Sequence, residues 1–312
     1  MSYTIRIATR ESRLALWQAE HVAALLRKAY VDVEVSLVPM TTTGDQIVDR
    51  TLAQVGGKGL FIKELEVAMN ESRAEIAVHS MKDVPSVLPE GMVINCVLER
   101  ADVRDAFVSK KYAGFASLPQ GAHVGTASLR RQSQLLAARP DLKISAVRGN
   151  VETRLRKLDE GQFDAIVLAS AGLTRLGLAD RITEYLDPSF CVPAVGQGVI
   201  GIECKANDYV TRAFCATLNH ADTEVCVNAE RAFAAKLEGS CQSPIAAHAI
   251  LKGDELQLTG LVAATDGSKV MRDHIAGPRS EWLELGDALA TRMLEAGAGE
   301  LLGLKSQEAA SK

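Results

Sequence analysis

The fold class is clearest in residues 123–176, HVGTASLRRQSQLLAARPDLKISAVRGNVETRLRKLDEGQFDAIVLASAGLTRL, where one alternation of strand and helix occurs three times. Each repeat is a short apolar run, a polar turn and then a helical spacing of apolar residues. Ser128 and Asn150 stand where the first two helices would begin. This alternation predicts a mostly parallel α/β sheet. The three runs are 123–126, 143–147 and 163–169.

The N-terminal part of the chain shows the same alternation. Thr4–Ala8 and Val31–Pro39 alternate like strands, and Ser12 can cap a helix that runs between them to about Ala29. Two strands joined through a helix predict a right-handed βαβ unit. A long polar loop, 41–59, follows. The next expected elements are a helix at Leu60–Ser72 and strands at Glu75–Ser80 and Met92–Leu98.

The C-terminal part follows a different pattern, which starts near Asp222. A helix at Glu224–Leu237, three alternating stretches and a closing helix at Trp282–Leu302 predict a small α+β domain with an antiparallel sheet. The alternating stretches are Ala246–Leu251, Leu256–Ala263 and Lys269–Ile275. Before them, the Gly-, Pro- and Val-rich segment 191–201 is typical of a crossover, after which Ile200–Cys204 would return as a strand to the first block.

Composition narrows the class of protein. The chain has 312 residues, 47% hydrophobic and 24% charged, and a net charge of −4, which disfavours bulk attraction to nucleic acid. No apolar run reaches the roughly 18 residues of a membrane span, and residues 1–13 lack the apolar core of a secretory signal. We therefore expect a cytoplasmic enzyme or binding protein with no nucleic-acid or membrane partner.

Several common sites are disfavoured. The six cysteines include no C-x-x-C pair, so we expect no metal site. The glycine- and lysine-containing segment 56–59 lacks the spacing of a nucleotide P-loop, and no G-x-G-x-x-G follows the first strand.

The most informative local signal is positive charge. Residues 128–157 include eight basic side chains and two acidic ones, and several arginines stand directly after predicted strands. Guanidinium groups at such positions, beside helix N-termini, bind carboxylates or phosphates bidentately. A solvated basic face remains the alternative. The arginines are Arg10, Arg130, Arg131, Arg148, Arg154 and Arg175.

Two further residues are candidates for chemistry. Asp83, in HSMKDVP at 79–85, is a surface ion pair, a helix cap or a carboxylate in a cationic cleft. In a cleft it could stabilise a developing positive charge or shuttle a proton. Its neighbour His79 is expected to be structural. Cys241, in EGSCQSP at 238–244, is either a structural thiol or an exposed nucleophile.

Seven blocks carry a resemblance that covers nearly the whole chain. In chain order they are IATRESRLALWQ, VGGKGLFIKELE, AVHSMKDVP, GTASLRRQSQL, VRGNVETRLRKL, VPAVGQG and EGSCQSPIAAH. Together they resemble the hydroxymethylbilane synthase, or porphobilinogen deaminase, family. The resemblance implies three α/β domains, of which the first two are similar to two-lobed periplasmic binding proteins. The expected limits are 1–98 with 199–216, then 104–192, then 221–312.

The resemblance also implies a reaction. Enzymes of this family join four porphobilinogen molecules head to tail and release four ammonia molecules and hydroxymethylbilane, a precursor of haem. They act as monomers and carry a dipyrromethane cofactor through a thioether, which here would be formed by Cys241. The acetate and propionate of each substrate account for a cleft that is rich in arginine.

The family's site residues transfer to matching positions of this chain. Asp83 would be the catalytic carboxylate, and Lys58 lies in the block that resembles the family's mobile lid. The incoming substrate would contact Arg10, Ser12, Gln18, Arg148 and Arg175. Carboxylates of the cofactor and growing chain would be held by Ser80, Lys82, Thr126, Ser128, Arg130, Arg131 and Arg154. Gly149, Asn150 and Gln197 would add backbone or amide hydrogen bonds.

Two positions depart from the family pattern. Ser240 replaces the second glycine before the cysteine, and Ser243 replaces an apolar residue, which questions the geometry of the loop but not the attachment. A non-catalytic two-lobed binding protein for a small polycarboxylate is the alternative function. An RNA-binding role is disfavoured by 4% aromatic content and by negative net charge.

Overall fold

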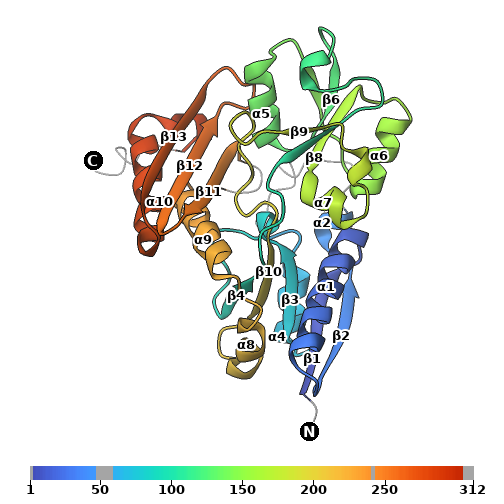
Figure 1. Cartoon of the computed structure of the whole chain (residues 1–312), viewed down its shortest axis with the longest axis vertical. Coiled ribbons are helices and arrows are strands. Elements are labelled where there is room, and N and C mark those ends of the chain that lie inside the picture. The colour runs from blue at the N-terminus through green and yellow to red at the C-terminus, as the bar shows by residue number, and fades with distance from the viewer. Residues whose placement is uncertain (1–2, 47–58, 240–242, 305–312) are drawn as a thin grey trace.

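The computed structural model describes residues 3–46, 59–239 and 243–304 and divides them into three lobes, each built on its own sheet (Figure 1). We call them lobes 1, 2 and 3. In Figure 1, lobe 1 lies below lobe 2, and lobe 3 lies beside both. Within the described residues, no helix has the length and apolar character that crossing a bilayer requires.

Lobe 1 has a five-stranded sheet in the order β2-β1-β3-β10-β4. β1 runs parallel to β2 and β3, whereas β10 runs antiparallel to β3 and β4. Its strands are β1 (Tyr3–Arg10), β2 (Val33–Met40), β3 (Ile76–Ser80), β4 (Met92–Val97) and β10 (Ile200–Lys205). Its helices are α1 (Arg13–Ala29), α2 (Thr43–Gln46), α4 (Lys63–Asn70), the 3₁₀ turn η1 (Met81–Asp83) and α8 (Tyr209–Ala216).

Helix α1 begins where the sequence predicts. The Ser12 hydroxyl accepts a hydrogen bond from the Ala15 amide and so caps the first turn. Val22 and Leu26, four residues apart, are fully buried in the same cluster as Ile5 and Ile7 of β1. The predicted βαβ unit and the return of residues 200–204 to the first sheet are both confirmed.

Lobe 2 has a five-stranded sheet in the order β7-β6-β8-β5-β9. β6 is parallel to β7 and β8, and β5 is antiparallel to β8 and β9. Its strands are β5 (Asp105–Val108), β6 (His123–Gly125), β7 (Lys143–Ser145), β8 (Ala165–Ala169) and β9 (Glu184–Leu186). Its helices are α5 (Leu129–Ala138), α6 (Val151–Asp159), α7 (Ser170–Arg175) and the 3₁₀ turns η2 (Phe115–Ser117) and η3 (Ala179–Arg181).

The sequence analysis did not predict β5 and β9. Both strands are short, so neither shows a readable alternation, and they are held by pairing with each other and with β8. β5 occupies in lobe 2 the place that β10 occupies in lobe 1. Each is an antiparallel strand that adjoins one of the chain segments crossing between the lobes.

Lobe 3 has the predicted three-stranded antiparallel sheet, in the order β11-β12-β13. Its elements are β11 (Ile245–Lys252), β12 (Glu255–Ala263), β13 (Val270–Pro278), α9 (Ala221–Lys236), the 3₁₀ turn η4 (Arg279–Glu281), α10 (Trp282–Glu295) and α11 (Ala298–Leu302). The prediction of one closing helix was wrong. Gly297 adopts a φ of +96°, a left-handed conformation that ends α10 and separates it from α11.

Candidate active site

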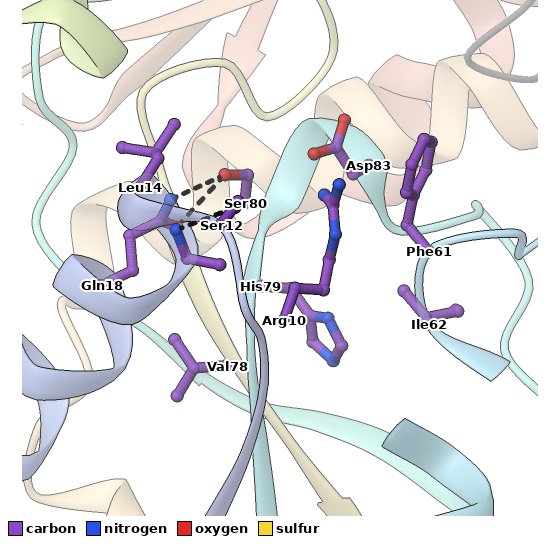
Figure 2. A pocket seen from close by; sticks show the side chains of 11 residues that line it. Arg10, Ser12, Leu14, Gln18, Phe61, Ile62, Val78, His79, Ser80 and Asp83 are labelled. Atoms are coloured by element: carbon purple, nitrogen blue, oxygen red, sulfur yellow. Dashed lines mark hydrogen bonds between the residues drawn. The ribbon is translucent and has the colours of Figure 1, made fainter. Parts of the chain in front are cut away.

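A pocket opens at the carboxyl ends of β1 and β3, where ligands gather in open α/β sheets (Figure 2). It brings together four residues that the sequence analysis selected at separate positions, namely Arg10, Ser12, Gln18 and Ser80, with Asp83 at its edge. Apolar side chains complete its wall. The remaining lining residues are Leu14, Ala15, Phe61, Ile62, Val78 and His79.

Asp83 ends η1, the short turn that follows β3. The turn is closed by a hydrogen bond from the Val84 amide to the Met81 carbonyl. Figure 2 shows the guanidinium of Arg10 pointing toward the Asp83 carboxylate. A strand end and a tight turn thus place this carboxylate among the residues that line the pocket.

Arg10, the last residue of β1, has an internal partner that the sequence did not reveal. Its Nε lies 3.0 Å from Oδ2 of Asp45, and its guanidinium lies 4.3 Å from the centre of the Phe61 ring. Burial alone would raise the pKa of Asp45, but hydrogen bonds from Arg10 and Thr42 outweigh it and lower that pKa. Arg10 is therefore oriented before any ligand arrives.

The Gln18 amide and the Ser80 hydroxyl lie 3.1 Å apart and join α1 to β3 (Figure 2). His79 is confirmed as structural. Its Nε2 lies 2.7 Å from Oε2 of the fully buried Glu203, on the neighbouring strand.

In lobe 2, Arg130 and Arg131 converge on a carboxylate that the sequence analysis missed. Asp105 is fully buried and lies 2.7 Å from a terminal nitrogen of each arginine. Burial opposes ionisation of Asp105, but the two guanidinium groups hold the pKa of that carboxyl far below its usual range. Ser128 caps α5 by accepting from the Arg131 amide, and Thr126 accepts from the Ser128 amide. Asp105 begins the unpredicted strand β5, so no pattern drew attention to it.

Lys82 and Arg154 link the two lobes electrostatically. Burial, assisted by Arg131 and Arg130, lowers the pKa of Lys82 to about 8, although Asp83 and Asp105 act in the other direction. Burial, with Arg131, Arg148 and Arg10, likewise lowers the pKa of Arg154 to about 10 against the opposing effect of Asp83. Cations from both lobes therefore crowd around Asp83.

The turn before α6 presents Arg148, Gly149 and Asn150. Nη1 of Arg148 is buried and makes no hydrogen bond within the described residues. Gly149 has a φ of +103°, and its carbonyl accepts from Nε of Arg154 at 2.8 Å. The Asn150 side chain caps α6 by accepting from the Thr153 amide. A buried donor without a partner is unfavourable unless a ligand supplies the acceptor.

Arg175 and Gln197 hold the crossover between the lobes. Arg175 donates to the Gly198 carbonyl at 2.7 Å and lies 5.9 Å from the Trp17 ring. Gln197, fully buried, donates to the Val103 carbonyl at 2.6 Å and to Asp105 at 2.9 Å. Contacts of these two residues with a ligand remain predictions.

Two predicted residues, Cys241 and Lys58, lie outside the described residues. The other five cysteines are buried, and burial raises the pKa of each thiol. It does so to about 12 for Cys96 and Cys191 and to about 11 for Cys204 and Cys226. Such thiols are poor nucleophiles because little thiolate forms and access is blocked.

Comparisons with known proteins identify the family of this chain. Residues 5–213 match the family model described as porphobilinogen deaminase, dipyrromethane cofactor binding domain, and residues 224–295 match the C-terminal domain of the same family. Among curated proteins, a porphobilinogen deaminase of Pelobacter propionicus is 54% identical over 298 residues, 96% of each chain.

A second porphobilinogen deaminase, from Methylobacillus flagellatus, is 53% identical over 305 residues, 98% of each chain. A solved structure, the periplasmic aliphatic sulphonate binding protein SsuA from Escherichia coli, is 15% identical. That match covers 76% of this chain and 71% of SsuA, with a TM-score of 0.41. Because two family models span most of the chain and full-length relatives are more than half identical to it, this chain belongs to the porphobilinogen deaminase family.

Proposed function

We propose that this chain is a transferase that joins four porphobilinogen molecules, releases four ammonia molecules and uses water to free the linear product hydroxymethylbilane, and that it so serves tetrapyrrole biosynthesis. One observation carries the proposal. The field of Asp83 acts on Lys82 of lobe 1 and on Arg154 of lobe 2, Arg10 lines the same pocket, and Arg131 and Arg148 are close enough to lower the pKa of Arg154. Such a site attracts a polycarboxylate and leaves one anion to act on a positively charged intermediate.

The residues present fit a dipyrromethane. The buried, unpartnered nitrogen of Arg148 and the lowered pKa values of Lys82 and Arg154 both indicate cations that need anionic ligands. We assign the cofactor's carboxylates to Ser80, Lys82, Thr126, Ser128, Arg130, Arg131 and Arg154. When bound, the dipyrromethane supplies the free pyrrole carbon to which the first substrate is joined.

Asp83 would act on the substrate as ammonia leaves. Each junction breaks the C–N bond of one aminomethyl group, whose electron pair leaves with ammonia, and forms one C–C bond. The pyrrole carbon that attacks then loses its proton, and its ring recovers its electrons. Positive charge develops on the substrate's pyrrole nitrogen before attack, and the Asp83 carboxylate would hold that N–H and stabilise the charge.

The incoming porphobilinogen would be held mainly by arginines. Arg10 stands at the pocket facing Asp83, and Ser12, Gln18, Arg148 and Arg175 complete the proposed contacts (Figure 2). Gly149, Asn150 and Gln197 would contribute through the backbone or through neighbouring side chains. Lys58 is retained as a proposed lid residue.

Cys241 is the proposed attachment point because each of the other cysteines is buried with a raised thiol pKa. A thioether needs an accessible sulfur, and none of these five offers one. We also propose that the protein works as a monomer in the cytoplasm. Light scattering of the purified chain tests the first point.

Intact-protein mass spectrometry tests the attachment. Freshly purified protein should carry an added mass equal to two linked pyrrole units, and Cys241→Ala should lose it. Cys226→Ala is the matched control and should keep it. Incubation with porphobilinogen should release ammonia, whereas a two-lobed binding protein would release none. An unmodified wild-type mass together with absent ammonia release would refute the proposal.

A further inference from the structure

A side chain of lobe 3, Arg231, makes hydrogen bonds to the segment directly after Asp83. The terminal nitrogens of Arg231 donate to three consecutive carbonyls: Pro85 at 2.8 Å, Ser86 at 3.1 Å and Val84 at 3.4 Å. Arg231 lies on α9, so these bonds join residues about 145 positions apart in the sequence. A planar guanidinium with several fixed donors can serve three neighbouring acceptors, which a single-point cation does less well.

In the part of the chain that the structure describes, Arg231 pairs with backbone carbonyls and not with a carboxylate, so its contact with the loop differs from a surface ion pair. All hydrogen bonds of the Arg231 guanidinium within the described residues go to these carbonyls. Burial lowers the pKa of Arg231, and the field of Glu203 opposes that change only in part. The unfavourable desolvation of the cation is offset by the bonds to the loop, so breaking them leaves a part-buried charge without those partners.

Packing reinforces the same contact. Val227 lies one helical turn before Arg231 and therefore on the same face of α9. It is buried in a small apolar cluster with Met81 and Val84, the residues that flank Lys82 and Asp83. The face of α9 that carries Val227 and Arg231 thus contacts residues 81–86, which include Asp83, through both apolar packing and hydrogen bonds.

We infer that Arg231 is a positioning residue that sets where Asp83 stands relative to α9. The inference rests on the proposed function for its catalytic consequence. α9 ends at Lys236, five residues before Cys241, so the helix that clamps Asp83 also leads into the segment with the proposed attachment site. The clamp would keep the carboxylate fixed with respect to lobe 3 while substrate is held chiefly by arginines of lobes 1 and 2.

The test compares Arg231→Met and Arg231→Lys with the wild type. Arg279→Met is the matched control, because Arg279 makes a 2.7 Å surface ion pair with Asp222 near the other end of α9. We expect Arg231→Met to lower kcat about tenfold or more with KM for porphobilinogen within about twofold, since small misplacement of a reacting group penalises the chemical step. Arg231→Lys should restore much of kcat, and Arg279→Met should behave as wild type.

A second readout does not depend on turnover. Hydrogen–deuterium exchange of peptides covering residues 81–86 should accelerate in Arg231→Met, less in Arg231→Lys and not in Arg279→Met. Wild-type kcat in Arg231→Met, an unchanged kcat with a raised KM, or unaltered exchange at 81–86 would each overturn the inference. If the wild type itself releases no ammonia, the proposed function fails, while the exchange data still decide whether the clamp exists.

Discussion

Oδ1 of Asp105 lies 2.7 Å from Nη2 of Arg131 in the interior of lobe 2, and Oδ2 of the same carboxylate lies 2.7 Å from Nη1 of Arg130. One buried anion therefore balances two buried cations. We expect Asp105→Asn to lower the free energy of unfolding by about 3–5 kcal/mol, because it leaves both guanidinium groups without their counter-charge. Urea denaturation at pH 7 measures the loss. Asp222→Asn, which breaks an exposed pair, should cost at most about 1 kcal/mol.

Titration of Asp105 should also make the free energy of unfolding depend on pH in acid. The pKa of Asp105 is lowered in the folded chain, so its contribution is present above the unfolded carboxyl pKa of about 4 and is lost as the pH falls further. The difference in unfolding free energy between wild type and Asp105→Asn should therefore be constant from pH 5 to 7 and shrink in stronger acid. A difference that grows on acidification would contradict this sign.

Asp83→Ala should abolish most turnover without unfolding the protein. Removing one electrostatic stabiliser of a transition state commonly costs about a hundredfold or more in rate. Ammonia release from porphobilinogen gives the rate, and urea denaturation gives the stability. Glu90→Ala, in the exposed loop that follows, is the control and should be fully active. A rate within tenfold of wild type would remove Asp83 from its proposed role.

Lys82→Met should stabilise the cofactor-free chain at neutral pH. The folded pKa of Lys82, about 8, lies below its ordinary value of 10.5, so burying the ammonium is unfavourable below pH 8 and less so as the pH rises from 8 to 10.5. In a Cys241→Ala background, Lys82→Met should raise the free energy of unfolding at pH 7.5 and raise it less at pH 9.5. A gain that is equal at both pH values would show that Lys82 does not titrate in this range.

Gly198→Ala should destabilise the protein by straining the segment 191–201, which crosses between lobes 2 and 1. Gly198 has a φ of +86°, and a Cβ there would lie 2.7 Å from the Ala101 carbonyl oxygen, a backbone atom that cannot move aside alone. Gly121→Ala shares the positive φ, at +73°, but its Cβ would meet open space. Both should lose about 1 kcal/mol from strain. Gly198→Ala should lose clearly more, and thermal unfolding of the two variants compares them.

Local features of the fold were predictable from the sequence, whereas long-range pairings were not. Ser12 caps α1 as expected, and α5 and α6 begin after Ser128 and Asn150 as predicted, because a helix start depends on residues only a few positions away. Asp105 and Asp45 were missed because their arginine partners lie 25 and 35 residues away. Likewise, three-residue β9 exists only through its pairing with β5.

In the candidate site, too, local features could be predicted from the sequence and long-range pairings could not. The sequence identified the arginines and Asp83 as charges at strand ends, and the structure brings Arg10, Ser12, Gln18, Ser80 and Asp83 to one pocket. The sequence could not show that Arg130 and Arg131 also pair with Asp105, since that depends on how β5 inserts into the sheet.

The position of β10 constrains the order in which the polypeptide can acquire its native structure during synthesis. Among the described residues, β4 pairs only with β10, and β10 follows it in the sequence by about a hundred residues. All strands of lobe 2, by contrast, come from the continuous segment 105–186. A ribosome-bound chain can therefore complete lobe 2 first. The edges of β3 and β4 that face β10 stay unpaired until residues 200–205 have been synthesised.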